Sequence, residues 1–177
     1  MYLSSYKNSK FFDESDIITY MQNFNEKLEN FDQKIINWAR GAMLPFARFA
    51  VFLVYFWFGL LKVLETSPAS PLVLALLDRT MPFVSPDAFL IAFGILEMVI
   101  GLLFIIPRLE RLAVFALFLH LITTTMPLVL LPSFVWQGFL TPTLEGQYII
   151  KNVLLLSAGI TVLASLSTLK KSNTSNV

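Results

Sequence analysis

The chain has 177 residues, of which 56% are hydrophobic and 14% are charged, and its formal net charge is +1. Its mean hydropathy of +0.69 is typical of a protein that crosses a membrane several times and excludes an ordinary soluble domain. The small net charge and the lack of a nucleic-acid-binding motif exclude nucleic acid as a partner. The absence of cysteine excludes disulfides, thiol relays, iron–sulfur clusters and thiolate-bound haem.

Residues 1–41 are predicted to be a polar cytoplasmic segment with an amphipathic helix. Large apolar residues recur there at alternating spacings of four and three: Ile17, Met21, Phe24, Leu28, Phe31, Ile35 and Trp38. This pattern places one apolar stripe on a helix that we expect to end near Gly41. The stripe fits a helix lying in the plane of a membrane surface, and the alternative is a coiled-coil or partner-docking helix.

The rest of the chain predicts an all-α membrane protein, a four-transmembrane-helix bundle over residues 42–169. The expected spans are residues 42–64, 88–106, 112–131 and 148–168, followed by a cytoplasmic tail of residues 170–177. The apolar piece at residues 72–77 is too short to cross a bilayer and predicts a surface or partly re-entrant segment. Pro127 breaks the third span near its end.

The basic residues predict the orientation of these spans. Five lie in residues 1–41, two in the link between the second and third spans, and two in the tail, whereas the other two loops contain only Arg79. The positive-inside rule then places both termini in the cytoplasm.

Glu97 is a carboxylate inside the second span, with Gly94 and Gly101 on the same helical face. A charge at mid-membrane costs about 2.5–3.5 kcal/mol on insertion scales, so we expect this face to point inward. His120 reaches about the same depth across the short link, and a carboxylate beside an imidazole can relay a proton or ligate a cofactor. The alternative is a neutral His120 and a protonated Glu97 that only hydrogen-bond across helices. Glu97→Gln is expected to leave detergent melting almost unchanged, because the amide keeps the size and the hydrogen bonding.

Further polar residues gather in the predicted outer half of the bundle. They are Lys62, Glu65, Lys151 and Asn152, with Thr123 and Thr124 on the face of His120. With Glu97 they predict a pocket that opens outward. Alternatively, the lysines extend to outer headgroups, Lys62 pairs with Glu65 on the surface, and the threonines bond their own backbone. Arg48, at the inner end of the first span, is expected to meet lipid phosphate.

These residues predict a quinone rather than a metal as the bound cofactor. One histidine without cysteine cannot build a closed metal site. A quinone needs an apolar cleft with one or two hydrogen-bonding groups, which this inventory provides. Haem bound through His120 is the less favoured cofactor.

Four short motifs carry a resemblance to a known family. They are Gly59–Lys62 (GLLK), Ser70–Val73 (SPLV), Gly94–Glu97 (GILE) and Gly146–Asn152 (GQYIIKN). Together they resemble the DoxX-like superfamily over about residues 44–168, and within it the YkgB-like branch, which includes a reactive-chlorine-resistance membrane protein. Asn152 departs from the pattern, which has an acid at that position.

The resemblance implies a bacterial inner-membrane protein with four helices and a role in redox chemistry or oxidative stress. Some DoxX-like members are subunits of thiosulfate:quinone oxidoreductase or of other membrane redox complexes. We therefore expect a membrane subunit that binds quinone in its outer half, with an oxidoreductase partner or with further copies of itself. The candidate catalytic residues are Glu97, His120, Lys62 and Lys151, and the candidate cofactor contacts are His120, Thr123, Thr124, Gln147 and Asn152. The alternative is a non-catalytic scaffold or a carrier of a small solute.

Overall fold

A computed structural model describes residues 14–166, so the predicted tail of residues 170–177 lies outside the described part of the chain. Four helical segments are long and apolar enough to cross a membrane: Ile17–Val63, Pro86–Ile105, Glu110–Leu130 and Leu144–Ala164. They confirm the prediction of a mostly helical chain with four candidate membrane spans. The chain divides into two compact units, Met1–Met43 and Leu44–Val177.

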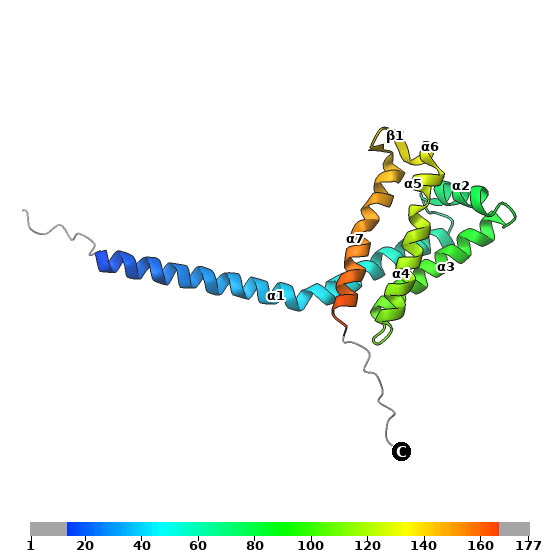
Figure 1. Cartoon of the computed structure of the whole chain (residues 1–177). Helices are drawn as coiled ribbons and strands as arrows, with labels where there is room; N and C mark the ends of the chain where they lie inside the picture. The colour runs from blue at the N-terminus through cyan, green and yellow to red at the C-terminus, as the bar shows by residue number, and fades with distance from the viewer. Residues whose placement is uncertain (1–13, 167–177) are drawn as a thin grey trace, which may run out of the picture. The chain divides into compact units, whose positions relative to one another are not determined.

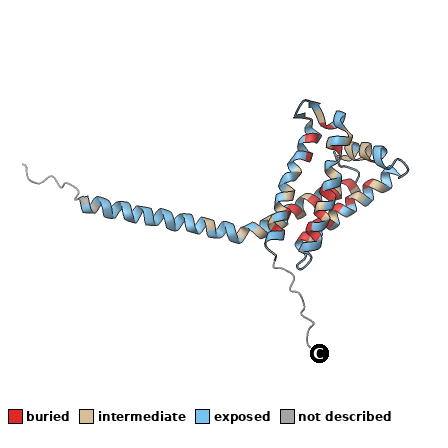
Figure 2. Cartoon of the chain, viewed as in Figure 1, coloured by how far each residue is buried: buried red, intermediate tan, exposed pale blue. Residues whose placement is uncertain are grey.

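Helix α1 runs from Glu14 to Val63. The sequence had predicted that a helix would end near Gly41, and this prediction is wrong. A glycine ends a helix when it takes a positive φ, and Gly41 does not. Pro45 lies inside the helix and lacks the N–H that would bond to the Gly41 carbonyl, but a single missing bond does not end α1. From Ile17 to Gly41 every residue except Ile36 is exposed (Figure 2).

The core of the second unit lies where the candidate spans meet. Helix α4 (Glu110–Thr125) packs between α3 (Pro86–Ile105) and α7 (Leu144–Ala164) (Figure 1). The buried core residues are Val51, Tyr55, Ile100, Phe104, Ala113, Val114, Leu117, Leu121 and Val162. On α1, α3 and α4 they recur at helical spacing and form one inward face, whereas the outward faces carry many exposed large apolar side chains. Such outward faces suit a lipid environment better than water.

Short elements gather at one end of this unit (Figure 1). They are α2 (Ser70–Thr80), α5 (Pro127–Leu130), α6 (Pro132–Val135) and the antiparallel strands β1 (Trp136–Gly138) and β2 (Thr141–Pro142). Helix α2 contacts α3 and α5. Its 11 residues span about 16 Å, which is too short to cross a bilayer and agrees with the predicted surface segment.

Several span boundaries differ from the prediction. Helix α7 begins at Leu144 rather than at residue 148, because the Thr143 hydroxyl caps it by accepting a hydrogen bond from Gly146 N at 3.1 Å. It ends at Ala164, earlier than expected. Helix α3 begins at Pro86, whose fixed φ suits the first turn of a helix. The predicted break at Pro127 is confirmed, since α4 ends at Thr125 and α5 starts at Pro127.

Arg48 was expected to meet lipid phosphate, but its guanidinium binds protein groups instead. Its Nε and Nη2 donate to the carbonyls of Phe104 and Ile105 at 2.6 and 3.2 Å. Its Nη1 lies 2.9 Å from Glu110 Oε1. The last carbonyls of a helix lack intrahelical partners and carry partial negative charge, so a cation is favourable there. Arg48 thereby links α1, the end of α3 and the start of α4.

Helices α1 and α3 approach most closely where two glycines face each other. A Cβ added at Gly59 would lie 2.5 Å from Gly94 O, and one added at Gly94 would lie 2.6 Å from Gly59 O. Both distances are too short for real atoms, so only glycine permits this approach.

We predict that Gly94→Ala destabilises the protein by about 1–3 kcal/mol, because the added methyl group overpacks the interface. The matched control is Gly41→Ala, whose Cβ would meet nothing within 4 Å and which should stabilise α1 by up to about 1 kcal/mol. Thermal unfolding in detergent measures both. Equal melting of Gly94→Ala and the wild type would contradict this account of the interface.

Candidate functional site

Four buried polar side chains from three helices meet inside the second unit. Tyr55 and Lys62 lie seven residues apart on α1, which places them two turns apart on one helical face. Glu97 comes from α3 and His120 from α4. Counted as whole residues, none of the four is more than 7% exposed. We call these residues the Glu97 network.

Lys62 and Glu97 form a buried ion pair. Lys62 Nζ donates to Glu97 Oε2 at 2.6 Å, and their side chains are 5% and 9% exposed. Lys62 therefore does not make the surface pair with Glu65 that was one alternative. Helix α1 ends at Val63, and Glu65 turns away on a backbone with φ of 58°. In a low-dielectric interior, each charge of the pair is tolerated because the other compensates it.

His120 links the ion pair to Tyr55. The Tyr55 hydroxyl lies 3.1 Å from His120 Nδ1, and His120 Nε2 lies 3.4 Å from Glu97 Oε1. A bare Nε2 lone pair facing a carboxylate is unfavourable, so these neighbours favour the tautomer with a proton on Nε2 and Tyr55 donating to Nδ1. The Nε2 position still makes no hydrogen bond of good geometry. It is the one buried side-chain nitrogen or oxygen without a partner in residues 14–166.

Aromatic rings hold the His120 imidazole in place. Phe93 stacks on it with ring centroids 5.0 Å apart and planes inclined by 27°, and Tyr55 meets it edge-on at 5.2 Å. Phe89 in turn stacks on Phe93 at 5.6 Å and 15°. Lys62 Nζ lies 5.7 Å from the Phe93 ring centroid, within reach of a cation–π interaction. The imidazole thus lies at the end of a stack of three flat rings.

The structure brings three of the four candidate catalytic residues together and leaves Lys151 apart. Lys151 is exposed, and its Nζ lies 5.3 Å from the Tyr148 ring centroid. Gln147, a candidate cofactor contact, is exposed as well. The single outward pocket that was expected to join Lys151, near the start of α7, to the Glu97 network is therefore not formed in the described chain.

Of the remaining candidate cofactor contacts, the two threonines bond to their own helix and Asn152 bonds to another helix. Thr123 Oγ1 donates to His120 O at 2.7 Å, and Thr124 Oγ1 donates to Leu121 O at 3.2 Å. This is the backbone alternative considered for both threonines. Asn152 Nδ2 donates to Thr124 Oγ1 at 3.4 Å and joins α7 to α4.

Sequence reasoning missed Tyr55 and Phe93. Tyr55 carried a usable signal, since it lies two helical turns before Lys62 on the same face. Phe93 lies one turn before Glu97, but nothing local distinguishes it from the many other phenylalanines. The neighbouring Trp57 and Phe58 are exposed on the helix surface.

The ion pair changes the expected effect of Glu97→Gln. Loss of the carboxylate charge leaves the buried Lys62 ammonium without a counter-charge, so we predict a stability loss of about 3–5 kcal/mol instead of a negligible one. Lys62→Met should cost a similar amount, and the double variant should cost much less than the sum.

A double-mutant cycle by unfolding in detergent measures this coupling. Lys151→Met is the matched control, since it removes an exposed lysine and should change stability by less than about 0.5 kcal/mol. Additive effects of the two substitutions would mean that the pair does not form.

No protein family, curated protein sequence or solved structure matches this chain in the three comparisons made. The resemblance to the DoxX-like superfamily therefore stays a prediction from the quoted motifs. The Glu97 network is the feature of the described chain from which a function can be argued.

Proposed function

We propose that this protein is a redox-associated subunit of the bacterial inner membrane that binds a quinone beside the Glu97 network and exchanges protons with it. The observation that carries the proposal is the buried, unpartnered His120 Nε2 at 3.4 Å from Glu97 Oε1. Leaving a buried donor or acceptor unsatisfied costs about 1–3 kcal/mol, and such sites are common where a ligand or a proton is handled. The resemblance to DoxX-like proteins supports the same assignment.

The Glu97 network is a row of polar atoms along which a proton could move, with one gap at His120 Nε2. Successive polar atoms from Tyr55 through His120 and Glu97 to Lys62 are separated by 3.1, 3.4 and 2.6 Å. Three of the four side chains, those of His120, Glu97 and Lys62, carry ionisable groups, and the Tyr55 hydroxyl can donate a hydrogen bond to His120. Ionisable residues inside a membrane span are expensive and are characteristic of proton or ion pathways.

The residues beside His120 also fit a quinone. Its Nε2 has free capacity for a carbonyl oxygen, and the stacked rings of Phe89 and Phe93 match a flat aromatic group. A bound quinone would supply a carrier of two electrons and two protons. His120 would hold and orient it, Glu97 and Lys62 would keep a proton at hand, and Phe93 would exclude water from the ring. The electrons would come from an oxidoreductase partner.

The basic residues support an orientation in which both termini face the cytoplasm. Because the chain has no cysteine, single cysteines can report this directly. We predict that Ser15→Cys is labelled by a membrane-impermeant reagent only after the cytoplasmic face is opened. Gly138→Cys, in strand β1, should be labelled in intact cells. The opposite pattern would overturn the orientation.

Quinone binding can be tested on protein purified in native lipid. We predict about one quinone per chain after extraction and mass spectrometry, and at least a tenfold loss in His120→Leu, because its buried hydrogen-bonding group is removed. Glu97→Asp should retain more quinone than Glu97→Gln, since it keeps the charge. The matched control Lys151→Met should keep the wild-type amount.

Other outcomes would point elsewhere. A Soret band in the absorption spectrum would make His120 a haem ligand. If the purified protein contains neither quinone nor haem, the assignment passes to a non-catalytic scaffold or a carrier of a small solute.

A further inference from the structure

The first unit carries a long apolar stripe that no described residue covers. Its seven side chains are between 48% and 69% exposed, although each is large and apolar: Ile17, Met21, Phe24, Leu28, Phe31, Ile35 and Trp38. All lie on α1, over a length of about 33 Å. A contiguous apolar surface of this kind marks an interaction site.

The spacing of the stripe is that of a coiled coil. The seven residues alternate by four and three without exception, which is a period of 3.5 sustained over three heptads. In heptad positions, Met21, Leu28 and Ile35 are a, and Ile17, Phe24, Phe31 and Trp38 are d. Apart from Ile18 and Tyr20 beside its first residues, the stripe is confined to a and d and is narrower than the apolar face of a helix that packs on a globular core or lies in a membrane surface.

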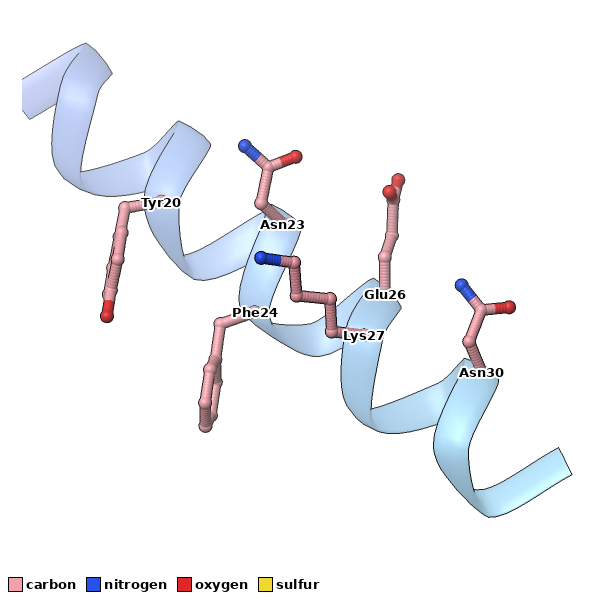
Figure 3. A pocket seen from close by; sticks show the side chains of 6 residues that line it. All are labelled: Tyr20, Asn23, Phe24, Glu26, Lys27 and Asn30. Atoms are coloured by element: carbon pink, nitrogen blue, oxygen red, sulfur yellow. The ribbon is translucent and has the colours of Figure 1, made fainter. Parts of the chain in front are cut away.

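The outward heptad positions are polar. Positions b, c and f between residues 17 and 38 are Thr19, Gln22, Asn23, Glu26, Glu29, Asn30, Gln33, Ile36 and Asn37, with Ile36 as the exception. Figure 3 shows this division directly: Tyr20 and Phe24 point to one side of the helix, and Asn23, Glu26 and Asn30 point to the other. The helix therefore presents one apolar seam and a hydrophilic back.

We propose that residues 17–38 form a parallel coiled coil with the same residues of a second copy of the chain. In a parallel pair, a residue at g faces the e residue five positions later on the partner helix. Lys27 is at g and Asp32 is at e, so the register of the stripe brings opposite charges together twice, once on each side of the seam. An antiparallel pair would bring g to face g, where Lys27 and Lys34 would repel.

Two further observations favour a second copy over a membrane surface as the occupant. Residues 17–41 contain three basic residues (Lys27, Lys34 and Arg40) and three acidic ones (Glu26, Glu29 and Asp32), so their net charge is zero. Helices that lie on anionic membranes are instead rich in basic residues. Two copies inserted in one membrane with the same orientation also enter the pairing in parallel. The inference is independent of the proposed function of the Glu97 network.

Disulfide cross-linking of the full chain in membranes tests the pairing. In a parallel pair, equivalent a residues of the two helices face each other within the Cα separation that a disulfide requires. Leu28→Cys and Ile35→Cys should therefore give covalent dimers, at least tenfold faster than the matched outward variant Asn30→Cys. Equal rates at the three positions would overturn the proposal. The proposal would also be overturned if Leu28→Cys gave no dimers and its cysteine reacted with a reagent dissolved in the lipid. That result would assign the stripe to the membrane.

A charge exchange tests the register. Lys27→Asp replaces two attractive pairs by two repulsive ones and should weaken dimerisation about tenfold. Adding Asp32→Lys to it should restore most of the loss. Lys34→Asp makes the same change of charge at a g position whose partner, Ala39, is uncharged, and it should have little effect. Equal weakening by Lys27→Asp and Lys34→Asp, without rescue by the exchange, would show that the helices do not pair in this register.

Discussion

The buried ion pair between Lys62 and Glu97 is the constraint on which the second unit depends. Two charges removed from water are tolerated only when they meet with good geometry, and here Nζ and Oε2 are 2.6 Å apart. The backbones that carry them also come close together, at Gly59 and Gly94. Gly59 precedes Lys62 by three residues, and Gly94 precedes Glu97 by three, so on each helix the glycine and the charge share a face. The glycine contact and the ion pair thus form one interface between α1 and α3.

Much of this fold follows from local patterns, and the exceptions have identifiable physical causes. Hydropathy located the candidate spans because length and apolar content determine whether a helix can cross a bilayer. Helix ends were harder to predict. The start of α7 depends on a single cap, Thr143, and α1 passes through Gly41 because that residue keeps a helical backbone. Whether glycine ends a helix is decided by the conformation it adopts, which its identity alone does not reveal.

For the candidate site, the sequence predicted which side chains lie at the same depth in the bundle. It did not predict the direction in which each side chain points. Glu97 and His120 were expected at one level, and they lie 3.4 Å apart. The direction of Lys62 was not predictable, since a lysine near the end of a span can extend outward or turn inward, and only the crossing of α1 and α3 decides between them. Arg48 is a similar case. Its partners are backbone carbonyls of Phe104 and Ile105, groups that every sequence contains and that no motif marks.

The position of Glu97 along α3 has an electrical consequence. Eleven residues of the helix precede it and eight follow it, so it lies near the middle of a segment long enough to cross a membrane. A charge that reaches this depth from either side has crossed about half of the transmembrane voltage. Since a full crossing corresponds to about 2.3 kcal/mol per 100 mV, half of it amounts to about 1.2 kcal/mol at 100 mV, or about sevenfold in an equilibrium constant. Glu97 therefore lies where the movement of a proton to it across a membrane would be sensitive to the transmembrane voltage.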